Sequence, residues 1–213
     1  SLEALDLMDM PVAMTAAGAL LQYLKETQKT NLLTITEISV YRNSNYMIID
    51  SSSRRNLELV ETMRDKEKRG SLLWVLDRTK TAMGARFLRQ NLEQPLRDKK
   101  MIEDRFDAIS ELIESLADRE ELREYLNAVY DLERLMTRIS YRTANPRDLV
   151  AFRNSIQVLP GIRNILSGMK SELLQNLYQE LDPLDDLTKL LVDAIDDDPP
   201  VSVHEGGILK EGY

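Results

Sequence analysis

The chain has 213 residues, a length that fits one large domain or one domain with a small appendage. Its 36 acidic residues outnumber its 28 basic ones, and the formal net charge of −8 disfavours a surface built to neutralise nucleic-acid phosphates. The absence of cysteine excludes disulfides, thiolate metal sites and cysteine nucleophiles. The single histidine, His204, excludes a two-histidine zinc motif. No apolar run approaches the roughly 18 residues of a membrane span.

The N-terminal region predicts one helix and two short strands. Residues 1–14 are expected to be a tail or linker, and apolar residues three and four positions apart predict an amphipathic helix over 15–29. Alternation over 33–41, followed by residues 46–50, predicts two short strands joined by a turn at 42–45. A small two-stranded β element near the N-terminus is therefore expected.

Nearly every segment after Asp50, a candidate N-cap, has the 3.6-residue period of a helix. The predicted helices lie near Arg54–Met63, Leu72–Arg78, Ala82–Leu92, Lys99–Leu116, Arg119–Ser140, Pro146–Val158, Ser171–Leu181 and Pro183–Ile195. The predicted fold class is therefore mainly α, a multi-helix core domain that carries the small β element.

Capping residues and prolines set the predicted helix ends. Asp118 with Glu121 three residues later has the pattern of a capping box, and Asn145 and Asp182 each precede a proline and are predicted N-caps. Three proline sites are predicted to end helices. They are Pro95, Pro160 with Gly161, and Pro199 with Pro200.

Two apolar seams stand out because their residues are spaced alternately by three and four. The first seam consists of Ile102, Phe106 (or Arg105), Ile109, Ile113 and Leu116. The second consists of Leu122, Tyr125 (or Leu126), Val129, Leu132, Met136 and Ile139. This spacing is typical of helices that pack against other helices, so both seams are predicted to be helix interfaces.

Two segments have features of functional sites. Residues 207–212 begin and end with glycine, but Tyr213 follows where a P-loop requires lysine and serine or threonine, so a turn is expected. The triplet at 196–198 consists of aspartates that suit a divalent metal or acid–base chemistry, and a carboxylate metal enzyme is one hypothesis. Consecutive aspartates point in different directions, so a solvated helix end is favoured. No catalytic, cofactor-binding or metal-binding residue is assigned.

The charge is unevenly distributed. Basic residues predominate over 54–105 and acidic residues over 172–213, a pattern that most simply reflects solvated helical surfaces or attraction between the two segments. Several arginines lie within or beside apolar helical patterns, and internal ion pairs are expected, such as Asp131 with Arg134 and Asp77 with Arg78. These arginines are expected to join helices rather than to contact phosphate.

Three runs carry a resemblance to a known family. The first joins Ile49–Asp50 to Arg54–Leu59, the second covers Gly70–Arg86 and ends in Gln94–Leu96, and the third joins Tyr130–Leu135 to Asn145–Leu149. In this order, and over about residues 16–213, they resemble the core, lever-bearing domain of the MutS family of DNA mismatch-repair proteins.

The resemblance implies a non-catalytic core domain over residues 15–213, without the mismatch-binding, clamp and ATPase domains. Such a domain would transmit ATP-driven conformational change between the ATPase and the clamp that grips DNA. The full-length protein is expected to be a bacterial, cytoplasmic ATPase that uses ATP and Mg²⁺, forms a homodimer and binds mismatched duplex DNA. This chain would contact mainly other domains of the same protein, with weak or no DNA binding and no membrane. The alternative is a free-standing helical scaffold for protein interactions.

The polar and turn-forming residues of the three runs are the candidate site. They are expected to hold the helices together or to face neighbouring domains, not to carry out catalysis. They are Arg54, Arg55, Asn56, Asp77, Arg78, Thr81, Gly84, Arg86, Asp131, Arg134, Arg138, Asn145, Pro146, Arg147 and Asp148.

Overall fold

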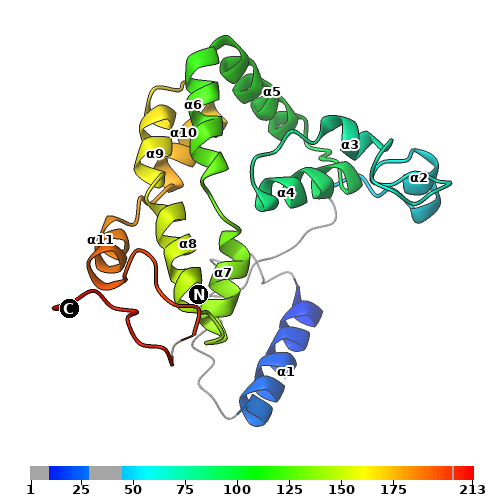
Figure 1. The fold of residues 1–213 in the computed structure, drawn as a ribbon. Helices are drawn as coiled ribbons and strands as arrows, with labels where there is room; N and C mark the ends of the chain where they lie inside the picture. The colour runs from blue at the N-terminus through cyan, green and yellow to red at the C-terminus, as the bar shows by residue number, and fades with distance from the viewer. Residues whose placement is uncertain (1–9, 29–44, 203) are drawn as a thin grey trace. The chain divides into compact units, whose positions relative to one another are not determined.

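The computed structural model describes residues 10–28, 45–202 and 204–213. Contacts between residues divide the chain into two compact units, 1–44 and 45–213. The described part of the first unit is helix α1, Pro11–Gln28, which begins slightly earlier than predicted (Figure 1). The predicted strand at 33–41 lies outside the described residues.

The second predicted strand, residues 46–50, is not present. Tyr46 forms an isolated antiparallel bridge with Leu96, and the Met47 amide donates to the Pro95 carbonyl at 2.8 Å. The segment therefore packs against the loop that follows a helix distant in the sequence, and residues 48–50 do not continue as a strand. The two-stranded prediction was wrong for this half, because a single bridge satisfies the segment.

Ten helices make up the described part of residues 45–213, which confirms the mainly α prediction (Figure 1). The bounds of these helices are α2 Ser51–Asn56, α3 Leu72–Leu76, α4 Ala82–Glu93, α5 Lys99–Glu114, α6 Leu116–Asn127, α7 Leu132–Ser140, α8 Pro146–Ile156, α9 Leu159–Ser167, α10 Glu172–Glu180 and α11 Asp185–Ala194.

The predicted caps succeeded at two sites and failed at two. Asp50 caps α2, and Asn145 begins α8 with a complete capping box, in which its side chain accepts from the Asp148 amide at 2.9 Å. Asp118 lies inside the first turn of α6 instead of capping a helix. Asp182 accepts from the amide of Leu184, whose left-handed backbone (φ 55°) delays the start of α11.

The helix predicted over Arg54–Met63 is the shorter α2, which ends before Glu58 adopts a left-handed backbone (φ 47°). Two further boundaries also differ from the predicted ones. The predicted helix over 119–140 is divided into α6 and α7, because Asp131 caps a new helix instead of continuing the old one. The predicted stop at Pro160 is within the first turn of α9, a helix that the sequence reasoning missed. Proline is well tolerated in a first turn, where no intrahelical donor is lost.

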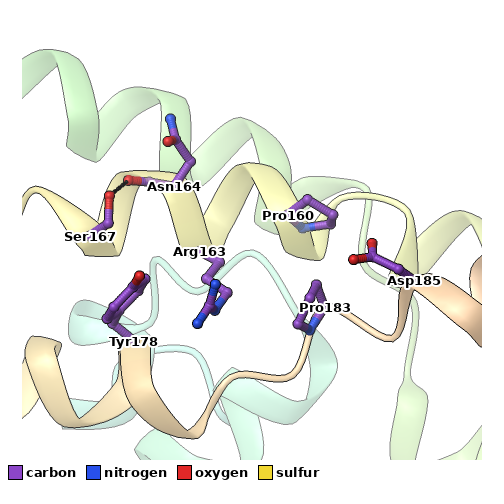
Figure 2. A pocket seen from close by; sticks show the side chains of 7 residues that line it. All are labelled: Pro160, Arg163, Asn164, Ser167, Tyr178, Pro183 and Asp185. Atoms are coloured by element: carbon purple, nitrogen blue, oxygen red, sulfur yellow. Dashed lines mark hydrogen bonds between the residues drawn. The ribbon is translucent and has the colours of Figure 1, made fainter.

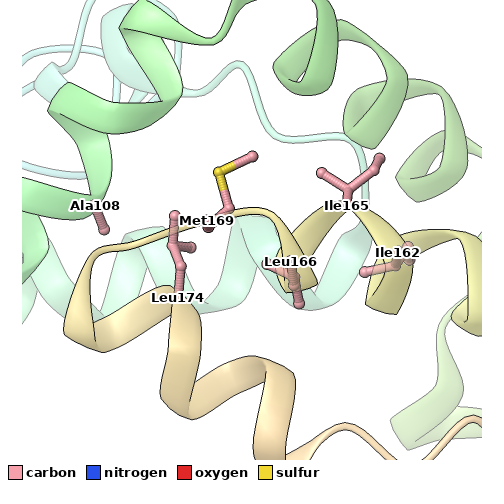
Figure 3. Packing of buried hydrophobic residues seen from close by; sticks show 6 residues of the cluster. All are labelled: Ala108, Ile162, Ile165, Leu166, Met169 and Leu174. Atoms are coloured by element: carbon pink, nitrogen blue, oxygen red, sulfur yellow. The ribbon is translucent and has the colours of Figure 1, made fainter.

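The first hydrophobic core joins α5, α9 and α10 (Figure 3). Figure 3 shows its six buried residues, and Leu122 and Tyr125 of the second seam pack against them from α6. The buried members are Ala108, Ile162, Ile165, Leu166, Met169 and Leu174.

The second hydrophobic core joins α7, α8 and α11. Ile156 is only 1% exposed at its centre, and Leu132 and Ile139 of the second seam pack against it. The second seam is therefore shared between two cores because its helix is broken at 128–131. The buried members are Leu135, Phe152, Ile156, Leu191, Ala194 and Ile195. Leu159 packs against both cores and so connects them.

A close approach at Gly161 yields a mutational prediction. A Cβ atom at this position would lie 2.5 Å from Cζ of Tyr125, so Gly161→Ala is expected to displace the ring and to lower the free energy of unfolding by about 2 kcal/mol. Gly168→Ala is the matched control, since its Cβ would meet only the Ile165 carbonyl oxygen at 3.5 Å. Urea unfolding measures the free energy of unfolding of both variants. Equal values would contradict the close contact between Gly161 and the Tyr125 ring.

Candidate functional site: a polar junction between helices

Four of the ten charged candidates lie in a series of contacts that we call the polar junction. It comprises Arg86, Asp131, Glu133, Arg138, Asp148, Arg153 and Asp197, and it joins α4, α7, α8 and the segment after α11. Each link connects residues that belong to different elements, so the junction ties distant parts of the sequence together.

The first link joins α4 to the start of α7. Both terminal nitrogens of Arg86 donate to the Asp131 carboxylate at 2.7 Å, and the guanidinium also contacts Glu133. The hydrogen bonds from Arg86 lower the pKa of Asp131, and those to Asp131 and Glu133 raise the pKa of the arginine. The predicted partner, Arg134, is a weaker neighbour at 3.4 Å from Asp131. The bidentate geometry fixes the angle of approach as well as the distance.

The second link joins the end of α7 to the start of α8. Arg138 lies 2.8 Å from Asp148, whose side chain is almost fully buried. The other carboxylate oxygen accepts from the Asn145 amide at 3.0 Å, and Pro146 occupies the first turn. One carboxylate therefore completes a capping box and an ion pair at the same time.

The third link joins α8 to the segment after α11. The buried side chain of Arg153 donates to the Ile195 carbonyl at 3.3 Å and lies 2.9 Å from Asp197. Six residues earlier on α8, Nε of Arg147 donates to the Pro199 carbonyl at 3.2 Å. The aspartate triplet thus faces arginines of α8.

The remaining candidates lie around α2, α3 and α4. Thr81 caps α4 by accepting from the Gly84 amide at 2.9 Å, and Nε of Arg54 donates to the Ile49 carbonyl. Arg55 and Asn56 are exposed at the end of α2. The structure therefore does not bring these residues into the polar junction.

Asp77 has a different partner from the predicted Arg78. Lys68 lies 2.5 Å from its carboxylate, and the Thr79 hydroxyl donates to it at 2.7 Å. These two hydrogen bonds lower the pKa of Asp77 from 3.8 to about 2. Arg78 donates only to the Asp77 carbonyl.

The lowered pKa of Asp77 predicts a pH dependence. Because the folded pKa is below the unfolded one, the stabilisation is complete above pH 5 and is lost as the pH falls through about 2. Asp77→Asn is expected to cost about 1 kcal/mol at pH 6, allowing for solvent screening, and about half of that at pH 3. Urea unfolding of both proteins at the two pH values measures this, and a difference that did not change with pH would contradict it.

A pocket of about 280 Å³ lies between α9, α10 and the loop before α11 (Figure 2). Arg163 stacks over the Tyr178 ring there, with 4.5 Å between the guanidinium carbon and the ring centroid. A second pocket, of about 330 Å³, lies where Arg147 faces Pro199. Neither pocket pairs a nucleophile with a base, so neither has the geometry of a hydrolytic site.

The segment with a glycine at each end, residues 207–212, packs back on the chain through Leu209 and Lys210. Gly207 and Gly212 have positive φ, as the predicted turn requires, and the intervening Lys210 donates to the Val192 carbonyl at 2.8 Å. Its ammonium is therefore directed at the chain itself. Within residues 10–28, 45–202 and 204–213, no three histidine or acidic side chains are grouped as metal ligands. None of the helices in these ranges is both long and apolar enough to cross a bilayer.

Comparisons with known proteins agree with the position of the three runs. The model of MutS domain III matches residues 52–211. The chain belongs to the MutS family. It is 57% identical over its whole length to the DNA mismatch repair protein MutS of Lachnoclostridium phytofermentans. It is 53% identical over 93% of its length to MutS of Acetivibrio thermocellus, and 50% identical over 93% to MutS of Listeria monocytogenes. The chain spans about 23% of the length of each of these relatives.

Three charged residues of this MutS domain were missed by the sequence reasoning, namely Lys68, Glu133 and Arg153, and Asp197 was interpreted only as part of a solvated helix end. Glu133 pairs with Arg86 and Arg153 with Asp197, and each of these partners is distant in the sequence. Glu133 lies inside the third run, two residues after Asp131, so its position was a usable signal. Lys68 and Arg153 had no such signal, because helical spacing indicates neighbours within one helix only.

Proposed function

We propose that this chain is the non-catalytic core domain of a MutS-type mismatch-recognition ATPase. It would pass conformational change between the ATPase and the DNA-gripping clamp of the longer protein, in which ATP and Mg²⁺ bind elsewhere. The observation that carries the proposal is the polar junction, since it links α4 to the segment after α11 through successive bidentate or buried contacts. A body tied in this way moves as a unit when one end is displaced.

Catalytic inactivity is the first test. The 213-residue chain is expected neither to hydrolyse ATP nor to bind a mismatched duplex appreciably at physiological salt, in line with its net charge of −8. Phosphate release and fluorescence anisotropy with a labelled duplex measure the two properties. Turnover above the background of a heat-denatured sample would contradict the proposal.

Rigidity is the second test, and the cysteine-free sequence allows site-specific labelling. Spin labels at Gln90→Cys on α4 and Lys189→Cys on α11 occupy exposed positions, and electron spin resonance measures the distance distribution between them. The proposal requires a narrow distribution that Arg86→Ala broadens, because this change removes the first link. Arg89→Ala, which removes an exposed pair within α4, is the control. A broad distribution in the unmodified protein would contradict a transmitting body.

A further inference from the structure

One outward face of α9 forms a wall of the pocket in Figure 2. Pro160, Arg163, Asn164 and Ser167 line the pocket at spacings of three and four residues, so they share one side of the helix. The buried residues of α9 belong to the first core and lie on its other side. The face that lines the pocket is therefore fixed in orientation.

Arg163 carries the positive charge of this pocket, and that charge has no acidic partner. Its Nε is buried without an acceptor, and its side chain forms no ion pair or hydrogen bond within the part of the chain that the structure describes. Buried polar atoms without a partner are uncommon in folded proteins. Tyr178, which stacks on the guanidinium, packs against the first core. The pocket thus holds a cation whose position is set before any ligand binds.

The stacked guanidinium favours a planar anion with a single charge. Because one face of the guanidinium lies on the Tyr178 ring, the terminal N–H groups of Arg163 remain available at its edge, where they match the two oxygens of a carboxylate. Asp185 lines the same pocket at the end away from Tyr178 (Figure 2). Its carboxylate repels the second charge of a phosphate and can accept from an N–H group of the ligand.

The length of the pocket fits a short extended peptide. Pro160 and Ser167 are seven positions apart on α9, which corresponds to about 10 Å along the helix axis. An extended chain covers this length with about three residues. A peptide supplies a carboxylate side chain for Arg163 and backbone N–H groups for Asp185, whereas a free carboxylate ion supplies only the first.

The rim of the pocket indicates a partner that binds reversibly. Asn164, Ser167 and Asp185 are polar and exposed. Permanent interfaces are more apolar than this. The polar rim therefore fits a separate protein better than a part of the same chain that would cover the pocket continuously.

We propose that this pocket binds an extended segment of a separate protein, in which an aspartate or glutamate side chain pairs with Arg163. The neighbouring backbone of that segment would donate to Asp185 and pack against Pro183. Duplex DNA is disfavoured, because Asp185 and the net charge of −8 repel phosphates. This inference does not depend on the proposed function.

The test follows the amide resonances of the isotope-labelled chain by NMR during titration with small probes. The probes are a capped alanine–glutamate–alanine tripeptide, the same tripeptide with glutamine, and sodium acetate. The glutamate peptide is expected to bind at least about 10-fold more tightly than either other probe, with shifts confined to α9 and to residues 178–185. Binding of acetate as tight as that of the peptide would show a site for a carboxylate ion only, and displacement of the peptide by equimolar inorganic phosphate would show a general anion site. Either result would overturn the proposal.

Substitutions separate this pocket from general charge attraction. Arg163→Gln should abolish the preference for glutamate over glutamine, whereas Arg64→Gln, at a site 95% exposed in the loop before α3, should preserve it. The urea midpoint of Arg163→Gln checks that the fold persists. Asp185→Asn, at an exposed site, is the second variant and should allow inorganic phosphate to compete with the peptide. An unchanged preference in Arg163→Gln, or phosphate still excluded in Asp185→Asn, would contradict the assigned roles.

The longer protein distinguishes a separate partner from an internal one. Its affinity for the glutamate peptide is expected to equal that of the 213-residue chain. Loss of binding in the longer protein would show that another of its own segments occupies the pocket, and the proposal would then be wrong.

Discussion

Replacing Asp148 with alanine is expected to lower the free energy of unfolding by about 3 kcal/mol. The substitution removes the acceptor of the Asn145 amide and the partner of Arg138 in one step. Asp148 is only 7% exposed, so water replaces these contacts poorly. Urea unfolding at neutral pH, followed by circular dichroism, measures the loss.

Two controls separate the components of this loss. Asp148→Asn keeps an acceptor for the capping box but removes the charge, and it is expected to cost about half as much. Arg138→Ala should cost about 1 kcal/mol or less, because the arginine is partly exposed and its loss leaves the capping box intact. If Asp148→Ala cost no more than Arg138→Ala, the carboxylate would not be the shared link between α7 and α8.

Local signals predicted the helices well, because caps act over a few residues. Asn145 before Pro146 specified the start of α8, and the observed capping box follows from that short pattern. The helix stop predicted at Pro160 was wrong because the proline pattern is equally local. A proline that ends one helix can also belong to the first turn of the next. Sequence periodicity alone does not distinguish these two cases.

Ion-pair partners that lie on different helices could not be predicted from the sequence. Spacing within a helix predicted Arg134 as the partner of Asp131, whereas Arg86, from another helix, makes the shorter contacts. The same limit applies to the first seam, which was wrongly predicted to be a helix interface within the chain, since four of its residues are between 52% and 62% exposed. A 3.6-residue period identifies an apolar face without showing what covers it. The fold class could be predicted, and the candidate residues could be named but not connected.

The second large effect concerns cooperativity between the two cores. Ile156→Ala removes the most buried side chain of the second core and is expected to cost about 3 to 4 kcal/mol. Because Leu159 packs against both cores, the substitution should also lower the stability of the helices around the first core. Leu166→Ala, at a 5% exposed site in the first core, is the reciprocal change.

Native-state hydrogen exchange distinguishes one cooperative body from two. If residues 45–213 unfold together, Ile156→Ala lowers protection in α5, α9 and α10 as much as in α7, α8 and α11. If the cores open independently, each substitution weakens only its own helices, and urea unfolding becomes biphasic. Independent opening would contradict the proposed transmission role, because the two cores could then move relative to each other. A displacement at α4 would not be passed on to α11.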